Sequence, residues 1–460
     1  MVGSGAAGLS AAVEAKEAGA NVIVFEKMKV TGGNTRLSDG GLAGPGNFLQ
    51  KSRGIEDSQQ LFYEDMIKAG MGLNHPHLVK IVAQKASETI DWTIKNLGLE
   101  YKTRLDRFGG HCAARCITTK NHTGADITKA QTKKLDRIGV PIRTNCLMTR
   151  LITDSTGAVQ GIQIKEGFKF GEAESGTIKN IKADHAVILA SGGFGNDIRF
   201  RTLQNPVLDE SIGSTNHRGA TAEGLIAALK INAASVHLSC IQTGPWGCAD
   251  ETGYGRGASF ASYSVYPFGI LIDPATGSRI VNEWADRKQR CDAIFKTGHI
   301  CIGIVDARGA EKAAFSLQSC LKSGKIKAFE KLSDIAMEYK MPPDKLESTV
   351  KAYNLMIKNK EQDEFGKLLQ QDSAQLLEKS PFYTVRLWPK VHYTSGGLGI
   401  NANAQVIDLD GQPIPGLFAA GEVCGGIHGA SRLGSCALTE CIVFGRIAGQ
   451  QAVKKRLVVK

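Results

Sequence analysis

Residues 1–27 read MVGSGAAGLSAAVEAKEAGANVIVFEK, and this stretch decides the fold. Gly3, Gly5 and Gly8 fit the pattern G-x-G-x-x-G, in which glycines let the backbone turn tightly and approach a ligand. Residues 9–18 follow with a helical pattern, and residues 21–25 form an apolar run typical of a buried strand. Glu26 ends that run eighteen residues after Gly8, near the ~20 expected of a dinucleotide-binding βαβ unit.

The same turn predicts how a dinucleotide binds. Amide dipoles at the start of the helix favour a pyrophosphate, and Glu26 is placed to accept hydrogen bonds from ribose hydroxyls. A second glycine cluster follows at residues 31–41. Residues 414–422 form a late strand and turn that end in Glu422, and they resemble the FAD-contacting strand of two-dinucleotide-type flavoproteins. We therefore expect FAD rather than NAD, bound by a domain built from both ends of the chain.

The composition of the 460-residue chain excludes several classes of protein. No stretch approaches the ~18 uninterrupted apolar residues of a membrane span, so an integral membrane protein is excluded. The net charge is +11, but the basic residues are scattered, which argues against nucleic acid and suits small carboxylates or an acidic partner. The eleven cysteines show neither zinc-type nor haem-type spacing, so we expect no metal site and no haem attached to this chain.

The start of the chain is unusual. Only two residues precede the first glycine of the turn, although a strand of about five residues is expected there. We interpret the chain as a fragment or as one with a misassigned start. A missing signal peptide would make the protein periplasmic, and otherwise we expect a cytoplasmic protein, so the compartment stays undecided.

Three later segments identify a family. Residues 281–287 read VNEWADR, residues 391–397 read VHYTSGG, and residues 425–434 read GGIHGASRLG. In this order they resemble three motifs of the fumarate reductase and succinate dehydrogenase flavoprotein family. The chain is most similar to the soluble flavocytochrome c-like branch, which includes fumarate, urocanate, methacrylate and cinnamate reductases.

The resemblance implies an α/β fold with a split Rossmann-like FAD-binding domain. That domain would comprise residues 1–243 and 391–460, and an α+β capping domain would be inserted at residues 244–390. Apolar runs near residues 269–272 and 301–305 indicate strands in the insert. Active sites at such a junction can close over substrate and exclude water.

The family reaction implies roles for three residues. Hydride passes from reduced flavin to the β-carbon of an α,β-unsaturated carboxylate, and a proton reaches the α-carbon. His392 and Arg432 match the pair that grips the carboxylate, where a guanidinium binds two oxygens at once. Arg287 matches the proton donor.

The resemblance also assigns cofactor contacts along the chain. Asn34 stands where membrane-bound relatives carry the histidine that links covalently to FAD, so we expect FAD to be bound non-covalently. The expected cofactor-binding residues are Gly3, Gly5, Ala6, Ala7, Gly8, Glu26, Lys27, Gly33, Asn34, Thr35, Asp39, Gly40, Gly41, Tyr393, Glu422, Ser435, Ala437 and Leu438.

The chain departs from the fumarate reductases where they bind a second carboxylate. Their H-P-T segment is replaced by residues 244–246, GPW, and their T-E-x-x-R segment by residues 262–266, SYSVY. We therefore expect fumarate to be a poor substrate and favour a monocarboxylate such as methacrylate or acrylate, a cinnamate, or urocanate. The expected substrate pocket comprises His111, Trp246, Tyr254, Phe260, Ser262 and Tyr263.

Several alternatives stay open at this point. The aromatic side chains can instead form the core of the capping domain, and Asp250 or Glu251 can instead meet the cationic ring of urocanate. The chain can also be a fumarate reductase proper, a related flavin oxidase or dehydrogenase, or a non-catalytic electron-transfer flavoprotein. Because the sequence has no haem or iron–sulfur motif, we expect an external electron donor, either a multihaem cytochrome c or a separate flavin domain.

Overall fold

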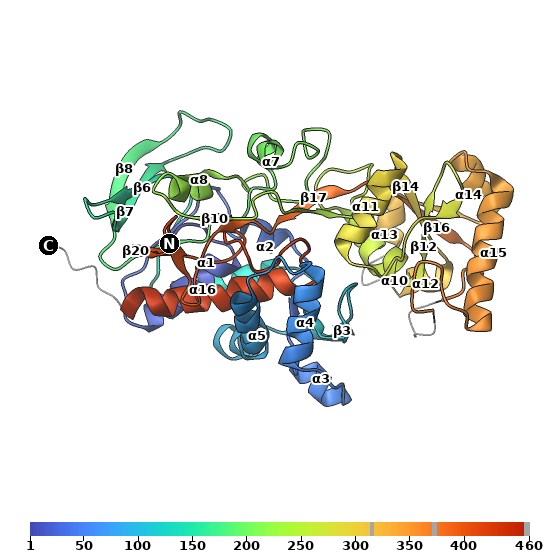
Figure 1. The fold of residues 1–460 in the computed structure, drawn as a ribbon, viewed down its shortest axis with the longest axis horizontal. Coiled ribbons are helices and arrows are strands. Elements are labelled where there is room, and N and C mark those ends of the chain that lie inside the picture. Colours follow the sequence, from blue (N-terminus) through green and yellow to red (C-terminus); the bar gives the residue numbers. More distant parts are fainter. Residues whose placement is uncertain (313–316, 370–374, 455–460) are drawn as a thin grey trace. The chain divides into compact units, whose positions relative to one another are not determined.

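The computed structural model describes residues 1–312, 317–369 and 375–454, which form two compact units (Figure 1). The first unit comprises Met1–Asp209, Asn216–Gln242 and the described residues from Tyr393 onward. The second comprises Glu210–Thr215 and Thr243–His392. The expected roles, FAD binding and capping, stay a prediction, because compactness alone assigns no role to a unit.

A largely parallel sheet lies at the centre of the first unit. β1 (Val24–Phe25) pairs in parallel with β5 (Ile142–Arg143), and β9 (Val187–Leu189) pairs in parallel with β20 (Pro413–Ala419). Val2 joins these pairs by parallel bridges to Phe25 and Leu189, so the short segment before the glycine turn supplies the middle of the sheet. This arrangement confirms the expected α/β class.

Two helices from opposite ends of the chain pack closely in the first unit. α1 (Ala6–Glu17) follows the glycine turn, and α16 (Cys436–Lys454) is the last described helix (Figure 1). A Cβ atom added at Gly445 would lie 2.4 Å from the carbonyl oxygen of Ala7, so only glycine permits this approach. The end of the chain thereby completes the domain that the beginning starts.

Smaller elements surround this arrangement. Two antiparallel three-stranded sheets, with strand orders β6-β7-β8 and β2-β4-β3, complete the main architecture of the first unit. Its other helices are α2 (Gly33–Leu37), α3 (Phe48–Arg53), α4 (Gln59–Ala69), α5 (Pro76–Leu97), α6 (Ala125–Arg137), α7 (Ile198–Gln204) and α8 (Glu223–Leu229). Its other strands are β2 (Gly41–Ala43), β3 (Tyr101–Asp106), β4 (Cys116–Thr119), β6 (Cys146–Thr153), β7 (Val159–Glu166), β8 (Thr177–Lys182), β10 (Ser235–Val236), β18 (Gly397–Leu398) and β19 (Gln405–Ile407).

An antiparallel five-stranded sheet forms the framework of the second unit, in the order β13-β12-β14-β16-β15. Its strands are β12 (Ile270–Asp273), β13 (Ser278–Arg279), β14 (Cys301–Val305), β15 (Ile326–Phe329) and β16 (Phe382–Leu387). Its helices are α9 (Arg256–Phe260), a π-helical turn (Ala261–Val265), α10 (Tyr266–Phe268), α11 (Arg287–Thr297), α12 (Ala307–Glu311), α13 (Leu317–Lys322), α14 (Leu332–Glu338) and α15 (Pro343–Asn359). β11 (Ile241–Gly244) and β17 (Lys390–Thr394) each run across a boundary between the units.

Each unit has its own hydrophobic core. In the first unit the core includes the apolar faces of α1, α5 and α16, and in the second it lies on both faces of the five-stranded sheet. Across the described residues, every helix is too short or too polar to cross a membrane.

Candidate active site

The glycine turn is tight and leaves the start of α1 open to a ligand. Gly3 has a φ of +101°, and a Cβ atom there would lie 2.2 Å from the carbonyl oxygen of Ala190. Gly5 precedes the helix and offers no side chain to cap it, while Thr35 Oγ1 accepts a hydrogen bond of 3.0 Å from the Ala6 amide. The amides that follow Ala6 at this helix start have no side-chain partner among the described residues, and aligned amides of this kind are a site for a phosphate anion.

Glu26 lies against this turn and Lys27 does not. Glu26 Oε2 accepts hydrogen bonds from the Ser4 amide at 3.0 Å and the Ser4 hydroxyl at 2.6 Å. The Lys27 ammonium instead forms an ion pair of 2.9 Å with Glu223 and donates to Thr221. Sequence reasoning missed these two partners, because they lie almost two hundred residues away along the chain.

The second glycine cluster lies next to the start of α16. A Cβ atom at Gly41 would lie 2.5 Å from Ser435 Oγ, and the Gly41 amide donates to Asp39 Oδ1 at 3.2 Å. Ala437 and Leu438 occupy the first turn of α16. The structure therefore brings together expected cofactor contacts that are nearly four hundred residues apart in the sequence.

Asn34 connects the same region to Glu422. Its Nδ2 donates to Glu422 Oε2 at 3.1 Å, and its Oδ1 accepts from the His217 amide at 2.7 Å. The other oxygen of Glu422 accepts from the Thr394 amide at 3.0 Å. Burial raises the pKa of Glu422 above its usual range.

Polar atoms without partners mark where a ligand would contact the first unit. Among the described residues, the hydroxyls of Ser191, Thr394 and Ser395 are buried and form no side-chain hydrogen bond. Since buried hydroxyls normally find partners, these groups and the open helix start fit the chemistry of a polar, phosphate-bearing ligand such as FAD. Gly3–Gly8, Glu26, Asn34 and Glu422 are the residues that would hold it.

Arg432 is a buried cation that forms no ion pair with any described residue. Its side chain is 5% exposed, its Nη1 donates to the Leu433 carbonyl at 2.9 Å, and its Nε has no hydrogen-bond partner among the described residues. No carboxylate oxygen of those residues lies within 4.0 Å of the guanidinium. Its charged carbon lies 4.6 Å from the ring centre of Tyr393, which also packs edge-on against His428 at 5.6 Å.

The second unit brings Arg287, Trp246 and His392 together. The Arg287 guanidinium lies 4.5 Å from the Trp246 ring centre, and the His392 ring meets Trp246 edge-on at 5.0 Å. His392 Nδ1 lies 2.7 Å from the Thr215 hydroxyl. Arg287 is the first residue of α11, which Asp286 caps by accepting a hydrogen bond of 2.8 Å from the Lys288 amide.

His111 is buried in the first unit, and both of its ring nitrogens contact protein groups. Arg115 Nη1 lies 3.2 Å from Nδ1, and the Gly434 carbonyl lies 3.0 Å from Nε2. A guanidinium can only donate, so Nδ1 accepts and Nε2 donates to Gly434. Burial, followed by the charge of Arg115, lowers the pKa of His111 to about 4. His111 thereby anchors the loop that carries Arg432.

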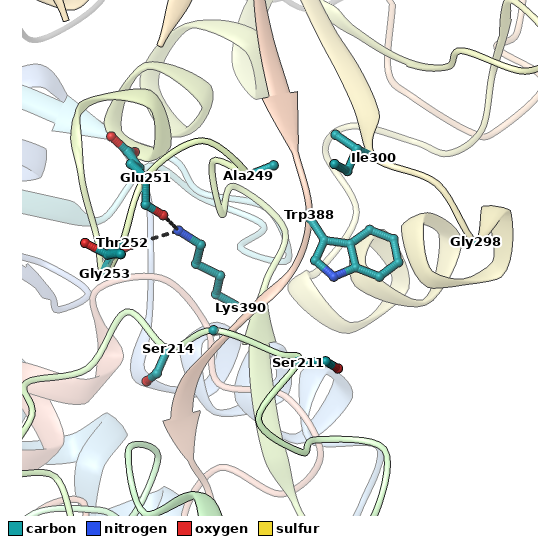
Figure 2. A pocket seen from close by; sticks show the side chains of 11 residues that line it. Ser211, Ser214, Ala249, Glu251, Thr252, Gly253, Gly298, Ile300, Trp388 and Lys390 are labelled. Atoms are coloured by element: carbon teal, nitrogen blue, oxygen red, sulfur yellow. Dashed lines mark hydrogen bonds between the residues drawn. The ribbon is translucent and has the colours of Figure 1, made fainter.

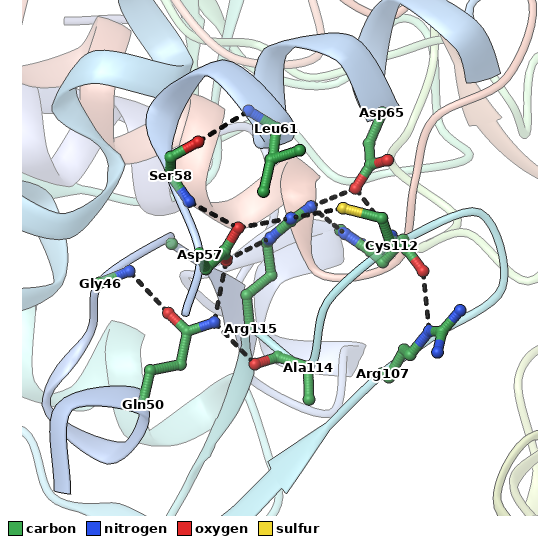
Figure 3. A network of polar contacts seen from close by, with 12 residues as sticks. Gly46, Gln50, Asp57, Ser58, Leu61, Asp65, Arg107, Cys112, Ala114 and Arg115 are labelled. Carbon is green, nitrogen blue, oxygen red and sulfur yellow. Dashed lines mark hydrogen bonds and ion pairs between the residues drawn. The ribbon is translucent and has the colours of Figure 1, made fainter. Parts of the chain in front are cut away.

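Arg115 is the centre of a buried network (Figure 3). Its guanidinium binds both oxygens of Asp57 at 2.7 and 2.8 Å and also pairs with Asp65. The Asp65 carboxylate accepts a hydrogen bond of 2.8 Å from the Cys112 amide. The sequence held no signal for this network, because its members come from three separate segments.

The other expected pocket residues occupy different environments within the second unit. Phe260 is fully buried in the core and packs edge-on against Tyr383, and Tyr263 is also buried. Ser262 is half-buried in the π-helical turn, and Tyr254 is half-buried against the same core. Most of these aromatic side chains thus pack in the core of the second unit.

A cavity of about 530 Å³ also lies within the second unit (Figure 2). Lys390 lines it and donates to the backbone carbonyls of Glu251 and Gly253, and burial lowers its pKa. The nearby acids are engaged within the unit: Asp250 pairs with Arg386 at 2.6 Å, and Glu251 accepts from the Ala258 amide at 3.0 Å. Sequence reasoning did not single out Lys390.

Comparisons with known proteins show which proteins this chain is similar to. The family model described as "FAD binding domain" matches residues 1–438. The acrylate reductase flavoprotein subunit of Shewanella woodyi is 39% identical over 98% of this chain and 90% of its own length. The urocanate reductase of Eggerthella lenta is 35% identical over 98% of this chain and 74% of its own. The open conformation of a flavocytochrome c3 fumarate reductase aligns with a TM-score of 0.78 at 30% identity, covering 98% of this chain and 77% of that structure.

Proposed function

We propose that this chain reduces the C=C bond of an α,β-unsaturated monocarboxylate. The chain belongs to the FAD-binding flavoprotein family of the fumarate reductase type. The observation that carries the proposal is Arg432, a buried guanidinium with no carboxylate partner among the described residues. A buried charge without a partner is costly, so such a site is suited to an anionic ligand.

Arg432 and His392 bind the substrate carboxylate in this proposal. A guanidinium can donate to both carboxylate oxygens and holds the acid in one orientation. When FAD is bound and reduced, it supplies the hydride that adds to the β-carbon. Negative charge then spreads from the α-carbon into the carboxylate, where the fixed positive charge of Arg432 stabilises it.

Arg287 gives the proton to the α-carbon. Arginine is a weak acid with a pKa above about 12, so it serves only a strongly basic carbanion. The Trp246 ring covers one face of the guanidinium at 4.5 Å and excludes water from that face. The positive charge of Arg287 also stabilises the negative charge before the proton moves.

The proposed substrate is a monocarboxylate of the acrylate type. Where fumarate reductases of the family bind a second carboxylate, this chain has Gly244, Ser262 and Tyr263, none of which carries a positive charge. Asp250 and Glu251 are engaged within the second unit, which disfavours the cationic ring of urocanate. The similarity to an acrylate reductase subunit supports the same choice.

FAD is bound without a covalent bond in this proposal, because Asn34 has an amide where a covalent link needs a nucleophilic ring nitrogen. The amide also already bonds to Glu422 and to the His217 backbone. The electrons come from an external donor, either a multihaem cytochrome c or a separate flavin domain. The net charge of +11 favours an acidic surface on that donor.

The test is reduction of acrylate by FAD-loaded protein with a reduced viologen dye as electron source. Arg432→Met should lower acrylate turnover by a factor of about 100 or more, the loss seen when a donor to a developing oxyanion is removed. Arg143→Met is the matched control, since Arg143 forms an exposed ion pair of 3.4 Å with Glu166 in the same unit. Full activity of the Arg432 variant would refute the proposed site.

A further inference from the structure

The ring of Tyr393 packs beside Arg432, and its hydroxyl is a donor without a partner among the described residues. The residue is 5% exposed, and its ring centre lies 4.6 Å from the guanidinium carbon of Arg432. Its hydroxyl forms no hydrogen bond with any other described residue. The hydroxyl oxygen keeps some exposure although the rest of the residue is buried, so it is the part of Tyr393 that an oxygen atom from a ligand can reach.

The carboxyl groups near Tyr393 and Arg432 do not accept hydrogen bonds from these two side chains. Glu422 and Glu440 are the carboxyls whose charges act on Tyr393, and Arg432 forms an ion pair with neither of them. Burial raises the pKa of both, that of Glu440 to about 8, so Glu440 is largely uncharged at neutral pH. Burial also raises the pKa of Tyr393, which keeps its hydroxyl protonated and able to donate.

A buried guanidinium next to a tyrosine ring, with no described residue accepting from the tyrosine hydroxyl, is complementary to an anion that has two oxygen atoms. The guanidinium contributes charge and N–H groups, and the phenol contributes one neutral O–H group. A carboxylate satisfies both, whereas a neutral alcohol or a cation does not. The arrangement thus extends the proposed carboxylate site by one residue that the sequence motifs assigned to the cofactor.

We propose that Tyr393 is a catalytic residue whose hydroxyl donates a hydrogen bond to the substrate carboxylate held by Arg432. The inference rests on the proposed function. The hydrogen bond strengthens as charge moves from the α-carbon into the carboxylate, because a more negative oxygen is a better acceptor. Tyr393 therefore acts more on the rate of reduction than on the binding of the acid.

The test uses FAD-loaded Tyr393→Phe, which keeps the ring against Arg432 and removes only the oxygen atom. We expect kcat/KM for acrylate to fall about 10- to 100-fold, the usual effect of losing a hydrogen bond to a charged group. A second measurement titrates propionate, which cannot be reduced, against the flavin absorbance spectrum. The affinity of Tyr393→Phe for propionate should fall by a smaller factor than its kcat for acrylate.

Tyr339→Phe is the matched control. Its hydroxyl lies 2.7 Å from the Thr384 hydroxyl within the second unit, so this variant also loses one buried tyrosine hydrogen bond. Its kinetics and propionate affinity should equal those of the unmodified protein, and flavin content should be equal in all samples.

The inference is overturned if Tyr393→Phe keeps both kcat/KM and propionate affinity within twofold while Arg432→Met loses activity. If the unmodified protein reduces none of the acids, the proposed reaction fails by itself. The propionate titration then still decides the role of the hydroxyl: weaker binding by Tyr393→Phe supports the contact, and equal binding refutes it.

Discussion

Replacing Arg115 by methionine should strongly destabilise the first unit. The Arg115 side chain is fully buried and binds both oxygens of Asp57 and one of Asp65 (Figure 3). Methionine fills similar space but leaves two carboxylates without their cation. Removing one partner of a buried ion pair costs about 3–5 kcal/mol, and the presence of two carboxylates places this case at the upper end.

That loss is a large fraction of the free energy of unfolding, which is about 5–15 kcal/mol for a typical domain. It also affects the site, since Arg115 fixes the His111 ring that donates to the Gly434 carbonyl. The free energy of unfolding should fall less in Arg115→Lys, by about 2 kcal/mol, because lysine keeps the charge but not the bidentate geometry.

Urea denaturation followed by flavin fluorescence measures this effect in the unit that carries the expected flavin site. Arg143→Met is the control, and its half-exposed ion pair with Glu166 should contribute less than about 1 kcal/mol. An Arg115→Met protein within about 1 kcal/mol of the unmodified one would refute the reasoning. Such a result would mean that Asp57 and Asp65 take up protons or water at little cost.

Three further predictions concern His111, Glu440 and the absence of a covalent bond to FAD. His111 has a pKa of about 4 in the folded protein and 6.5 in the unfolded chain, so the unfolded chain binds more protons and the free energy of unfolding falls as the pH drops between these values. In urea titrations between pH 7 and pH 4, the free energy of unfolding of His111→Gln should fall by about 3 kcal/mol less than that of the unmodified protein. Burial raises the pKa of Glu440 from 4.5 to about 8, so the unfolded chain loses its proton first and the free energy of unfolding falls as the pH rises through this range. With FAD bound, Glu440→Gln should therefore be more stable than the unmodified protein by about 4 kcal/mol at pH 8 and by almost nothing at pH 4. Acid precipitation should release all the flavin into the supernatant, because Asn34 offers no nucleophile, and flavin that stays in the pellet would contradict this.

Much of the fold could be predicted from the local sequence. The helical pattern of residues 9–18 corresponds to α1 (Ala6–Glu17), and the apolar runs near residues 269–272 and 301–305 correspond to β12 and β14. Glycine turns and apolar periodicity act over a few residues, so one sequence displays them directly. The strand expected at residues 21–25 is only Val24–Phe25, because its pairing depends on distant Ile142 and Arg143.

The candidate site was less accessible to sequence reasoning. Motifs indicated Arg287, His392 and Arg432, but not which side chain lies beside each. The contact between Tyr393 and Arg432 depends on how β17 and the 425–434 loop fold together, and no local pattern encodes it. The Asp57–Arg115–His111 network was hidden for the same reason.

The ratio of kcat/KM for acrylate to kcat/KM for fumarate tests the central claim most directly. The FAD-loaded protein is assayed with a reduced viologen dye and both acids under identical conditions. We expect a ratio well above one, because Arg432 can hold one carboxylate and the positions of Gly244, Ser262 and Tyr263 supply no cation for a second. A ratio below one would contradict it and would show that another group in the chain binds the second carboxylate.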